Sequence, residues 1–322
     1  MSTSPSTWPA EWTALRSDNW TAVVDPLGAQ LSILRDAQGR DLLWDGNPAF
    51  WTGRAPILFP IVGALNEGHY RWRGQRYALP RHGLARTRRF ELLRSGEREL
   101  VFRLRFDEET LKVYPFRFEL DVAFRMEGQA FEIKAAARNV GDEPMPVSMG
   151  FHPAFRWPLF SGAAGEAAPR DAHSIEFTFS EPAPVRRLDA SGLVTPTPQA
   201  SPVQGRQLAL NDALFAQDVV IFDQLVSRQL SYGASPAPDS PAAPGAPGST
   251  RLSVSFAGAT HLGLWSKPGA PFLCIEPWCG MADPVGFNQE LDRKPGVFFV
   301  PPGSVRSLAM QIELQDGKQT GR

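Results

Sequence analysis

The stretch PFRFELDVAFRM, residues 115–126, alternates apolar and charged side chains with a period of two. The apolar side chains occupy every second position: Phe116, Phe118, Leu120, Val122 and Phe124. The charged side chains lie between them: Arg117, Glu119, Asp121 and Arg125. Because successive side chains of a strand point to opposite faces of a sheet, this pattern predicts a strand with one buried and one solvated face. Such strands are typical of antiparallel sheets.

The same alternation recurs in segments on both sides of this stretch: residues 100–106, 131–137, 174–180, 251–256 and 307–314. Turn signals separate the segments at short intervals: residues 25–28, 127–128 and 139–142. The only helix that we expect is a turn or two near Asn211 to Ala216. Short strands divided by turns, with almost no helix, predict an all-β fold of antiparallel strands.

Residues 233–250, GASPAPDSPAAPGAPGST, form a low-complexity segment rich in Pro, Ala, Gly and Ser. This composition provides too little apolar surface to form a packed core. Both flanking segments, LVSRQLSY and RLSVSF, have strand patterns. We therefore expect a flexible hairpin loop at 233–250 inside one domain that spans residues 1–322. A linker between two domains is the alternative.

The composition narrows the classes of partner. The 322 residues are 43% hydrophobic, and 33 basic against 34 acidic residues leave a net charge of −1. This balance gives no indication of binding to nucleic acid or to an anionic membrane. No segment approaches the roughly 18 apolar residues of a spanning helix, and residues 1–14 do not have the pattern of a signal peptide. We expect a cytoplasmic protein that binds neither nucleic acid nor a membrane.

The two cysteines, Cys274 and Cys279, are separated by four residues. Two thiols are too few for a structural zinc site or for a framework of disulfides. We expect both cysteines to be free thiols, and we expect no metal.

Two of the histidines have a distinctive setting. The five are His69, His82, His152, His173 and His261. His82 lies in LPRHGLARTRRF, and His152 lies in SMGFHPAF. Because each is followed directly by Gly or Pro, the backbone rather than side-chain packing is expected to fix its position. Both are candidates for proton transfer; a polar residue with purely structural hydrogen bonds is the alternative.

Glu276 interrupts the apolar segment FLCIEPWCGMADP, residues 272–284. Burial disfavours the charged form of a carboxyl group, which suits a general base that works near neutral pH. An ion pair with an arginine near His82 is the alternative. The sequence contains no G-x-S-x-G, no Gly-rich phosphate loop and no H-E-x-x-H, so acyl-enzyme hydrolysis, nucleotide chemistry and zinc catalysis are disfavoured.

Three segments in this order resemble the aldose 1-epimerase (galactose mutarotase-like) family over nearly the whole chain: FPIVGALNEGHYRWRGQRYALPRHGLAR, SMGFHPAF and CIEPWCG. The resemblance implies a β-supersandwich with an open cleft and a cofactor-independent interconversion of the α and β anomers of an aldose, in a monomer or homodimer. By this resemblance Glu276 is the base, His152 is the acid at the ring oxygen, and His82 holds the sugar. The aromatic residues around His152 would then form the wall of the cleft.

Further positions follow from the same resemblance. Asp218, in AQDVVIF, is similar to an aspartate that binds sugar hydroxyls, and the nearby Asp223 is the competing candidate. Ala64 stands where many galactose mutarotases carry an arginine. Arg54 and Arg86 stand where hexose-6-phosphate epimerases carry basic residues, and the guanidinium fork suits a phosphate. Solvated surface arginines are the alternative.

Three functional hypotheses remain open from the sequence. The first is an aldose 1-epimerase acting on a hexose or a hexose 6-phosphate. The second is a non-catalytic carbohydrate-binding protein on the same scaffold. The third, a glycoside hydrolase, requires two carboxylates across the scissile bond, and Asp283 is the only second candidate beside Glu276.

Overall fold

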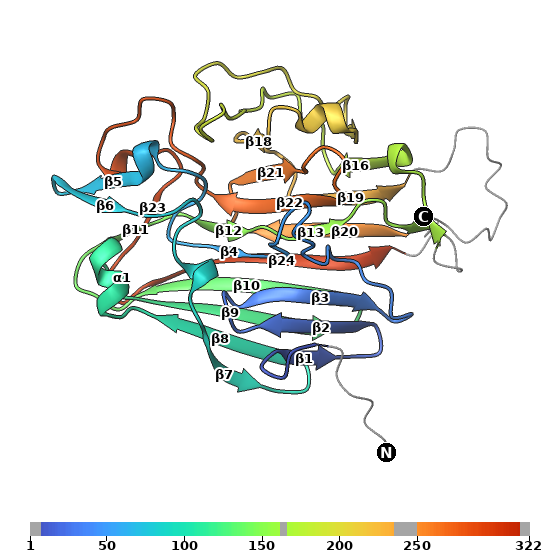
Figure 1. Ribbon diagram of the computed structural model, residues 1–322, viewed down its shortest axis with the longest axis horizontal. Helices are drawn as coiled ribbons and strands as arrows, with labels where there is room; N and C mark the ends of the chain where they lie inside the picture. Colours follow the sequence, from blue (N-terminus) through green and yellow to red (C-terminus); the bar gives the residue numbers. More distant parts are fainter. Residues whose placement is uncertain (1–7, 162–165, 235–249, 316–322) are drawn as a thin grey trace.

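Two antiparallel sheets dominate the computed structural model, which describes residues 8–161, 166–234 and 250–315 (Figure 1). Within these ranges the larger sheet has nine strands. In spatial order they are β17 (Gln207–Ala209), β16 (His173–Phe177), β19 (Gln229–Ala234), β20 (Arg251–Ala257), β24 (Val305–Gln315), β10 (Ala130–Asn139), β9 (Phe118–Glu127), β8 (Glu99–Arg105) and β7 (Glu91–Ser95).

In Figure 1 the smaller sheet lies above β24, β10, β9 and β8 of the larger sheet, at the level of β16, β19 and β20, and it carries the candidate site. Its strands are β18 (Val220–Phe222), β21 (His261–Trp265), β22 (Phe272–Cys279), β12 (Met149–Phe151) and β4 (Ile57–Leu58), in this order, with β13 (Ala154–Arg156) also paired to β22. A third sheet contains β1 (Thr13–Arg16), β2 (Trp20–Asp25) and β3 (Gln30–Asp36). Short pairs complete the described strands: β5 (His69–Trp72) with β6 (Gln75–Ala78), β11 (Met145–Val147) with β23 (Phe298–Val300), and β14 (Phe160–Ser161) with β15 (Glu166–Ala167).

The alternation that predicted the fold is present in β9. Leu120, Val122 and Phe124 are buried, whereas Glu119 and Asp121 are partly exposed on the opposite face. On that outer face the guanidinium group of Arg103 forms ion pairs with both carboxylates, at 3.0 Å and 2.5 Å. The prediction of an all-β fold is confirmed.

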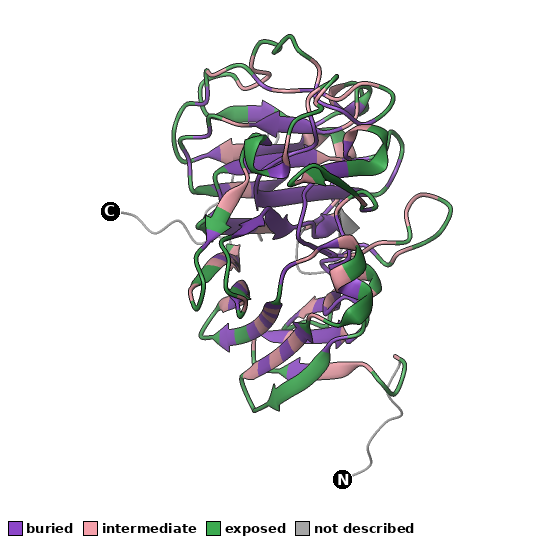
Figure 2. Ribbon diagram, turned by 90° about the vertical axis from the view of Figure 1, so that its left-hand side faces the viewer, coloured by how far each residue is buried: buried purple, intermediate pink, exposed green. Residues whose placement is uncertain are grey.

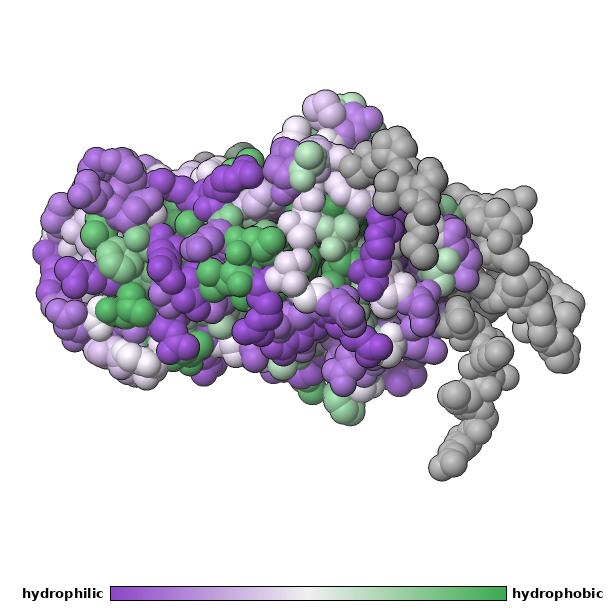
Figure 3. Space-filling view, turned by 90° about the horizontal axis from the view of Figure 1, so that it is seen from below, coloured by the Kyte–Doolittle hydropathy of each residue, from purple (hydrophilic) through white to green (hydrophobic). Residues whose placement is uncertain are grey.

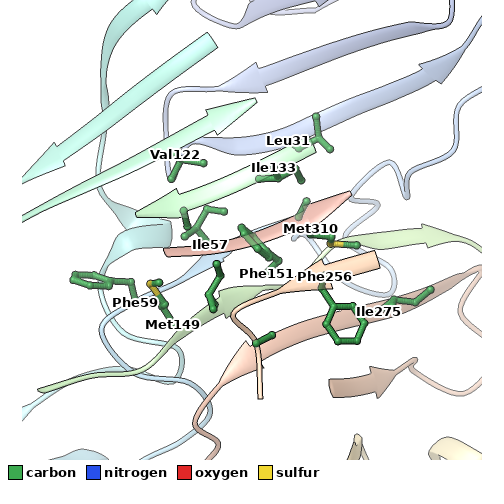
Figure 4. Packing of buried hydrophobic residues seen from close by; sticks show 14 of the residues in the cluster. Leu31, Ile57, Phe59, Val122, Ile133, Met149, Phe151, Phe256, Ile275 and Met310 are labelled. Atoms are coloured by element: carbon green, nitrogen blue, oxygen red, sulfur yellow. The ribbon is translucent and has the colours of Figure 1, made fainter. Parts of the chain in front are cut away.

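The inner faces of the three sheets share one hydrophobic core. Leu31 of β3, Ile133 of β10 and Phe151 of β12 lie in this core, as Figure 4 shows. Buried residues follow the strands of the sheets, and the loops around them are largely exposed (Figure 2). Seen from below, hydrophilic residues divide the apolar surface into separate patches (Figure 3). Since β22 is buried along its whole length, it is covered on both faces.

Helix is scarce, and the structure corrects one detail of the prediction. The helical turn expected near Asn211 is present as the 3-10 turn η4 (Asp212–Phe215), capped by the Asn211 side chain. The other 3-10 turns are η1 (Asn66–Gly68), η2 (Ala85–Thr87), η3 (Arg170–Ala172) and η5 (Leu291–Arg293). The α-helix α1 (Glu108–Val113) was not predicted, because six residues are too few to show helical periodicity. Its capping box, formed by Asp107 and Thr110, was the available signal.

The strands beside the low-complexity segment are direct neighbours. β19 pairs with β20 in an antiparallel register that places Gly233 opposite Arg251. The expected loop at 233–250 therefore begins later, because Gly233 belongs to β19, and residues 235–249 lie outside the described residues. The assignment of residues 1–322 to one domain stays a prediction. None of the described helices is long and apolar enough to cross a membrane.

Candidate active site

A cavity of about 240 Å³ lies against the smaller sheet. Five of the six residues predicted from the sequence line it: His82, Arg86, His152, Asp218 and Glu276. These residues come from distant parts of the chain, so the fold brings them together. The sixth residue, Arg54, does not line the cavity.

The strand β22 presents alternate residues to the cavity and to the core. Leu273 and Ile275 belong to the main hydrophobic core. Glu276 and Trp278, which have the opposite parity, line the cavity. Because side chains of a strand alternate, Cys274 shares the face of Glu276. The carboxyl group of Glu276 therefore reaches the cavity from a central strand without disturbing the core.

The register of the neighbouring strands brings His152 to Glu276. Gly150 of β12 pairs with Trp278, and Ala154 of β13 pairs with Cys274. His152 lies between these two pairings, at the break where Pro153 interrupts the strand. Its Nε2 atom is 3.2 Å from Oε2 of Glu276.

Two glycines make room for the indole ring of Trp278. A Cβ atom on Gly263 of β21 would lie 2.4 Å from the ring, and one on Gly150 would lie 2.3 Å from the Trp278 Cβ atom. Real side chains do not tolerate such distances. Glycine on both neighbouring strands therefore allows a tryptophan to form part of the cavity wall beside Glu276.

Burial controls the protonation of the His152–Glu276 pair. Only 7% of His152 and 1% of Glu276 is exposed to solvent. Burial raises the pKa of Glu276 well above its usual value, and the charge of Asp218 raises it further. Burial lowers the pKa of His152 to about 3, and the charge of Arg86 also lowers it. At neutral pH the pair therefore holds one proton, so that one group can donate while the other accepts.

Both members of the pair keep an atom free for a ligand. Nδ1 of His152 and Oε1 of Glu276 are buried and have no hydrogen-bond partner among the described residues. Buried polar atoms are normally satisfied, so unpaired ones at a cavity indicate a place for ligand atoms or water.

The backbone places His82 opposite this pair. His82 has a left-handed φ of 69°, and the following Gly83 has φ of 75°. A Cβ atom on Gly83 would lie 2.2 Å from the carbonyl oxygen of Phe59, so only glycine fits. The backbone N–H of Gly63 donates to Nδ1 of His82 at 3.2 Å, and the backbone N–H of His82 donates to the Gly63 carbonyl at 2.9 Å.

The His82 ring is neutral at physiological pH. Burial lowers its pKa well below the usual value, and the positive charges of Arg86 and Arg81 add to this effect. Since Nδ1 accepts a hydrogen bond, the proton of the neutral ring is on Nε2. The His82 ring lies edge-on to the His152 ring, with 5.5 Å between the ring centroids.

Tryptophans far from His152 in the sequence form the aromatic wall. The rings of Trp51 and Trp265 lie 4.9 Å and 5.8 Å from the His152 ring, and both residues line the cavity. The expectation that the aromatic neighbours of His152 in the sequence form this wall is wrong. Phe151 and Phe155 have the opposite strand parity, and both are buried in the main core.

Two arginines line the cavity without a partner. Neither Arg81 nor Arg86 makes a side-chain hydrogen bond or ion pair in the part of the chain that the structure describes. Burial lowers the pKa of Arg86, and the charge of Arg81 contributes. Arg81 was not predicted from the sequence, because nothing in LPRHGLARTRRF distinguishes it from the other arginines of this segment. Its guanidinium lies against Gly192, where a Cβ atom would clash with it.

Arg54 has structural contacts instead. Its Nη1 atom donates to the backbone carbonyl of Ser32 at 2.9 Å, and its guanidinium lies 5.3 Å from the Trp12 ring centroid. Arg54 therefore contributes to packing near the sheet of β1, β2 and β3, outside the cavity.

The three candidate aspartates have different surroundings. Asp218 lines the cavity, whereas Asp223 forms an ion pair with Arg186 at 2.8 Å and does not line it. Asp283 accepts from Lys294 at 2.5 Å and does not line the cavity either. Among the three, Asp218 is thus the one that a cavity-bound ligand can contact, and the glycoside-hydrolase hypothesis loses its proposed second carboxylate.

Ala64 lines the cavity at the position where the resemblance placed an arginine, so no guanidinium enters from there.

Both cysteines are buried free thiols, as predicted.

Antiparallel sheets that hold a buried His–Glu pair, a second histidine and tryptophans around one cavity define a mutarotase-like protein. The chain belongs to the aldose 1-epimerase family, whose sequence model matches residues 13–229. The plasmid-encoded protein LacX of Lactococcus lactis is 29% identical over 309 residues, which cover 93% of this chain and 98% of LacX.

Solved structures have the same fold. A galactose mutarotase related enzyme from Lactobacillus acidophilus superposes with a TM-score of 0.82 and 26% identity, over 97% of this chain and 99% of its own. A galactose mutarotase-like protein from Lactobacillus casei gives a TM-score of 0.80 at 24% identity, over 94% of this chain and 100% of its own. The predicted galactose mutarotase-like fold is confirmed.

Proposed function

We propose that this protein is an aldose 1-epimerase that interconverts the α and β anomers of a hexose or a hexose 6-phosphate. The observation that carries the proposal is the buried His152–Glu276 pair, 3.2 Å apart at the cavity wall. Anomerisation requires one proton donor and one proton acceptor, and it requires no nucleophile. A pair that holds a single proton supplies both.

The proposed reaction moves two protons and breaks one ring bond. Before the reaction the proton of the pair passes from Glu276 to His152 across the 3.2 Å contact between Oε2 and Nε2. Glu276 then takes the proton of the anomeric hydroxyl, the bond between C1 and the ring oxygen breaks, and His152 gives its proton to that oxygen. The resulting aldehyde rotates about the bond between C1 and C2. Ring closure then reverses both proton transfers on either face of C1. Because no group is consumed, the pair returns to its starting protonation state.

The remaining residues of the cavity hold the sugar in this proposal. His82, with its proton on Nε2, donates to a sugar oxygen, and the carboxylate of Asp218 accepts from sugar hydroxyls. Trp51, Trp265 and Trp278 offer apolar faces to the C–H groups of the ring. No cofactor is part of the proposed reaction.

The proposal is tested by anomer exchange on freshly dissolved aldoses and hexose 6-phosphates, followed by NMR or polarimetry. Glu276→Gln and His152→Asn should each lower the rate about 10²- to 10⁴-fold, the range of general acid and base catalysis. The double variant should be little slower than the slower single variant, because the two groups act as one unit. Glu109→Gln and His69→Asn, both exposed, are the matched controls and should keep the wild-type rate.

A rate for Glu276→Gln above about a tenth of the wild-type value would show that Glu276 is only structural. A non-catalytic carbohydrate-binding protein is the second candidate, and Ala64 at the cavity wall favours it. Wild-type protein that binds an aldose in calorimetry but does not exceed the buffer rate of anomerisation would establish this second function.

A further inference from the structure

A third side chain with metal-binding chemistry adjoins the acid–base pair. One ligand atom each of His152, Cys274 and Glu276 lies within 4.8 Å of the other two, and all three residues are buried. We propose that these three residues bind a thiophilic divalent cation of the Zn²⁺ type, and that the bound ion inhibits the protein. The inhibition rests on the proposed function, whereas the binding of the ion does not.

The fold brings this cluster together through the register of β22. Cys274 and Glu276 are two residues apart and project from the same face of the strand. His152 lies between the strand pairings that place Gly150 opposite Trp278 and Ala154 opposite Cys274. Cys274 and Glu276 lie on a central, buried strand, and β12 and β13 fix His152 on both sides, so the three donors are held more rigidly than donors on loops.

The donor set matches zinc in type and charge. Zn²⁺ binds imidazole nitrogen, thiolate sulfur and carboxylate oxygen, usually four ligands in all. Burial raises the pKa of the Cys274 thiol and of the Glu276 carboxyl group, so the ion must displace a proton from each when it binds. The resulting thiolate and carboxylate, with a neutral imidazole, carry two negative charges, which a divalent ion neutralises in a buried site. His152 and Glu276 also line the cavity, so an ion can enter from there, and the fourth position is open to water.

Two polar atoms of the cluster have no hydrogen-bond partner among the described residues. Nδ1 of His152 and Oε1 of Glu276 are both buried without a hydrogen-bond partner in the described part of the chain. Ligand atoms lie about 2.0–2.3 Å from a zinc ion, so the side chains need to close in slightly around it. An ion held there takes up the lone pairs that the pair uses to accept a proton, and proton transfer stops.

The other cysteine provides a matched control. Cys279 lies on the same strand but on the opposite face, in the main core, where its Sγ atom donates to the carbonyl of Gly258 at 3.1 Å. Cys274→Ser removes the sulfur ligand of the cluster, whereas Cys279→Ser removes a buried thiol outside it. Both changes replace sulfur by oxygen in a buried position, so nonspecific effects on packing should be similar.

The experiment titrates the reduced full-length protein with Co²⁺, whose thiolate charge-transfer absorption reports a sulfur ligand, and then displaces Co²⁺ with Zn²⁺. We expect one ion per chain and a charge-transfer band in wild type and in Cys279→Ser. Cys274→Ser should lose the band and bind Zn²⁺ at least about tenfold more weakly. Anomerisation by wild type and Cys279→Ser should be inhibited by Zn²⁺ and restored by a chelator.

The results also separate the two proposals. A missing charge-transfer band in wild type, or a band that persists in Cys274→Ser, would overturn the metal site whatever the enzymatic activity. A band that depends on Cys274 in a protein without epimerase activity would retain the metal site and refute the proposed function. If Cys274→Ser does not fold, Cys274→Ala provides the same comparison with an apolar side chain.

Discussion

His152 and Glu276, the proposed acid and base, owe their unusual pKa values mainly to burial. Burial lowers the pKa of His152 to about 3 and raises the pKa of Glu276 well above its usual value. The active form of the pair, with one proton, therefore extends over the pH range between these two limits. Below this pH range His152 also binds a proton, so the pair holds two protons. Above it Glu276 loses its proton, so the pair holds none.

We therefore predict that kcat/KM for anomerisation stays level from about pH 6.5 to pH 5, where a histidine with its ordinary pKa of about 6.5 would titrate. The acid limb should lie near pH 3, and the alkaline limb should follow the raised pKa of Glu276. The measurement is a pH profile of kcat/KM by NMR exchange. A limb centred near pH 6.5 would contradict the pairing.

Stability at each pH is the control for this profile. The unfolded His152 side chain binds a proton near pH 6.5, whereas the folded one does so near pH 3. Between these values the unfolded state binds more protons, so the contribution of His152 to the free energy of unfolding falls as the pH falls. Circular dichroism at each pH separates loss of fold from loss of catalysis.

The unpaired guanidinium groups of Arg81 and Arg86 lead to a prediction about the substrate. If the substrate is phosphorylated, Arg81→Ala and Arg86→Ala should each lower kcat/KM for a hexose 6-phosphate roughly 10- to 100-fold. This follows from about 1.5–3 kcal/mol per hydrogen bond to a charged group. The rate for the unphosphorylated hexose should change less, and kinetics on both sugars measure the difference.

Arg54→Ala is the comparison for these two variants. Because its guanidinium donates to Ser32 outside the cavity, the preference between the two sugars should stay at its wild-type value. Equal use of both sugars by the wild-type protein would rule out phosphate recognition. A loss of preference in Arg54→Ala would return this residue to the binding site.

At the scale of the element, the alternation of side chains along β22 places Glu276 and Trp278 at the cavity. The period of two in FLCIEPWC could be read from the sequence, and it would have placed Cys274, Glu276 and Trp278 on one face. The chain segments that meet this face could not be predicted. Trp51 and Arg81 reach the cavity from loops, and loops have no periodicity that links them to a distant strand.

The glycines beside β22 give a prediction at this scale. In Gly263→Ala the new methyl group would lie 2.4 Å from the Trp278 ring, which must then move toward the cavity. We expect the free energy of unfolding to fall by about 1–3 kcal/mol, typical of an overpacked site, and KM to rise. Thermal unfolding and steady-state kinetics test these effects.

Gly96→Ala is the matched control, because the nearest atom to its new methyl group would be 3.7 Å away, at ordinary contact distance. This variant should retain wild-type stability and KM. An unchanged KM in a folded Gly263→Ala variant would show that the Trp278 ring can shift without affecting the sugar site.

For the whole molecule, the sequence predicts the fold class and the main strands because β-sheet periodicity is local. The segments 131–137, 251–256 and 307–314 fall within strands of the larger sheet, and the strands expected at 100–106 and 174–180 end at Arg105 and Phe177. Strand order is set by contacts between distant residues, which one sequence does not reveal. The pairing of β10 with β24 is such a case.

The low-complexity segment allows a test of whether the chain folds as one domain. Replacing residues 235–249 with a short Gly-Ser turn should change the free energy of unfolding by less than about 1 kcal/mol, because loop length has a weak effect on closure entropy. The strands β19 and β20 already pair on either side of the segment. Chemical denaturation and anomer exchange measure the effect. Insoluble protein after the replacement would contradict both this prediction and the assignment of one domain.

The complete burial of β22 affects how the protein loses its activity on heating. Backbone amides of a strand that lies between two neighbours and is covered on both faces exchange with solvent only when the surrounding structure opens. Glu276 and its neighbours on this strand therefore belong to the last part of the molecule to open. The proposed catalytic groups should keep their positions up to the midpoint of global unfolding, so we expect inactivation and denaturation to occur as one transition.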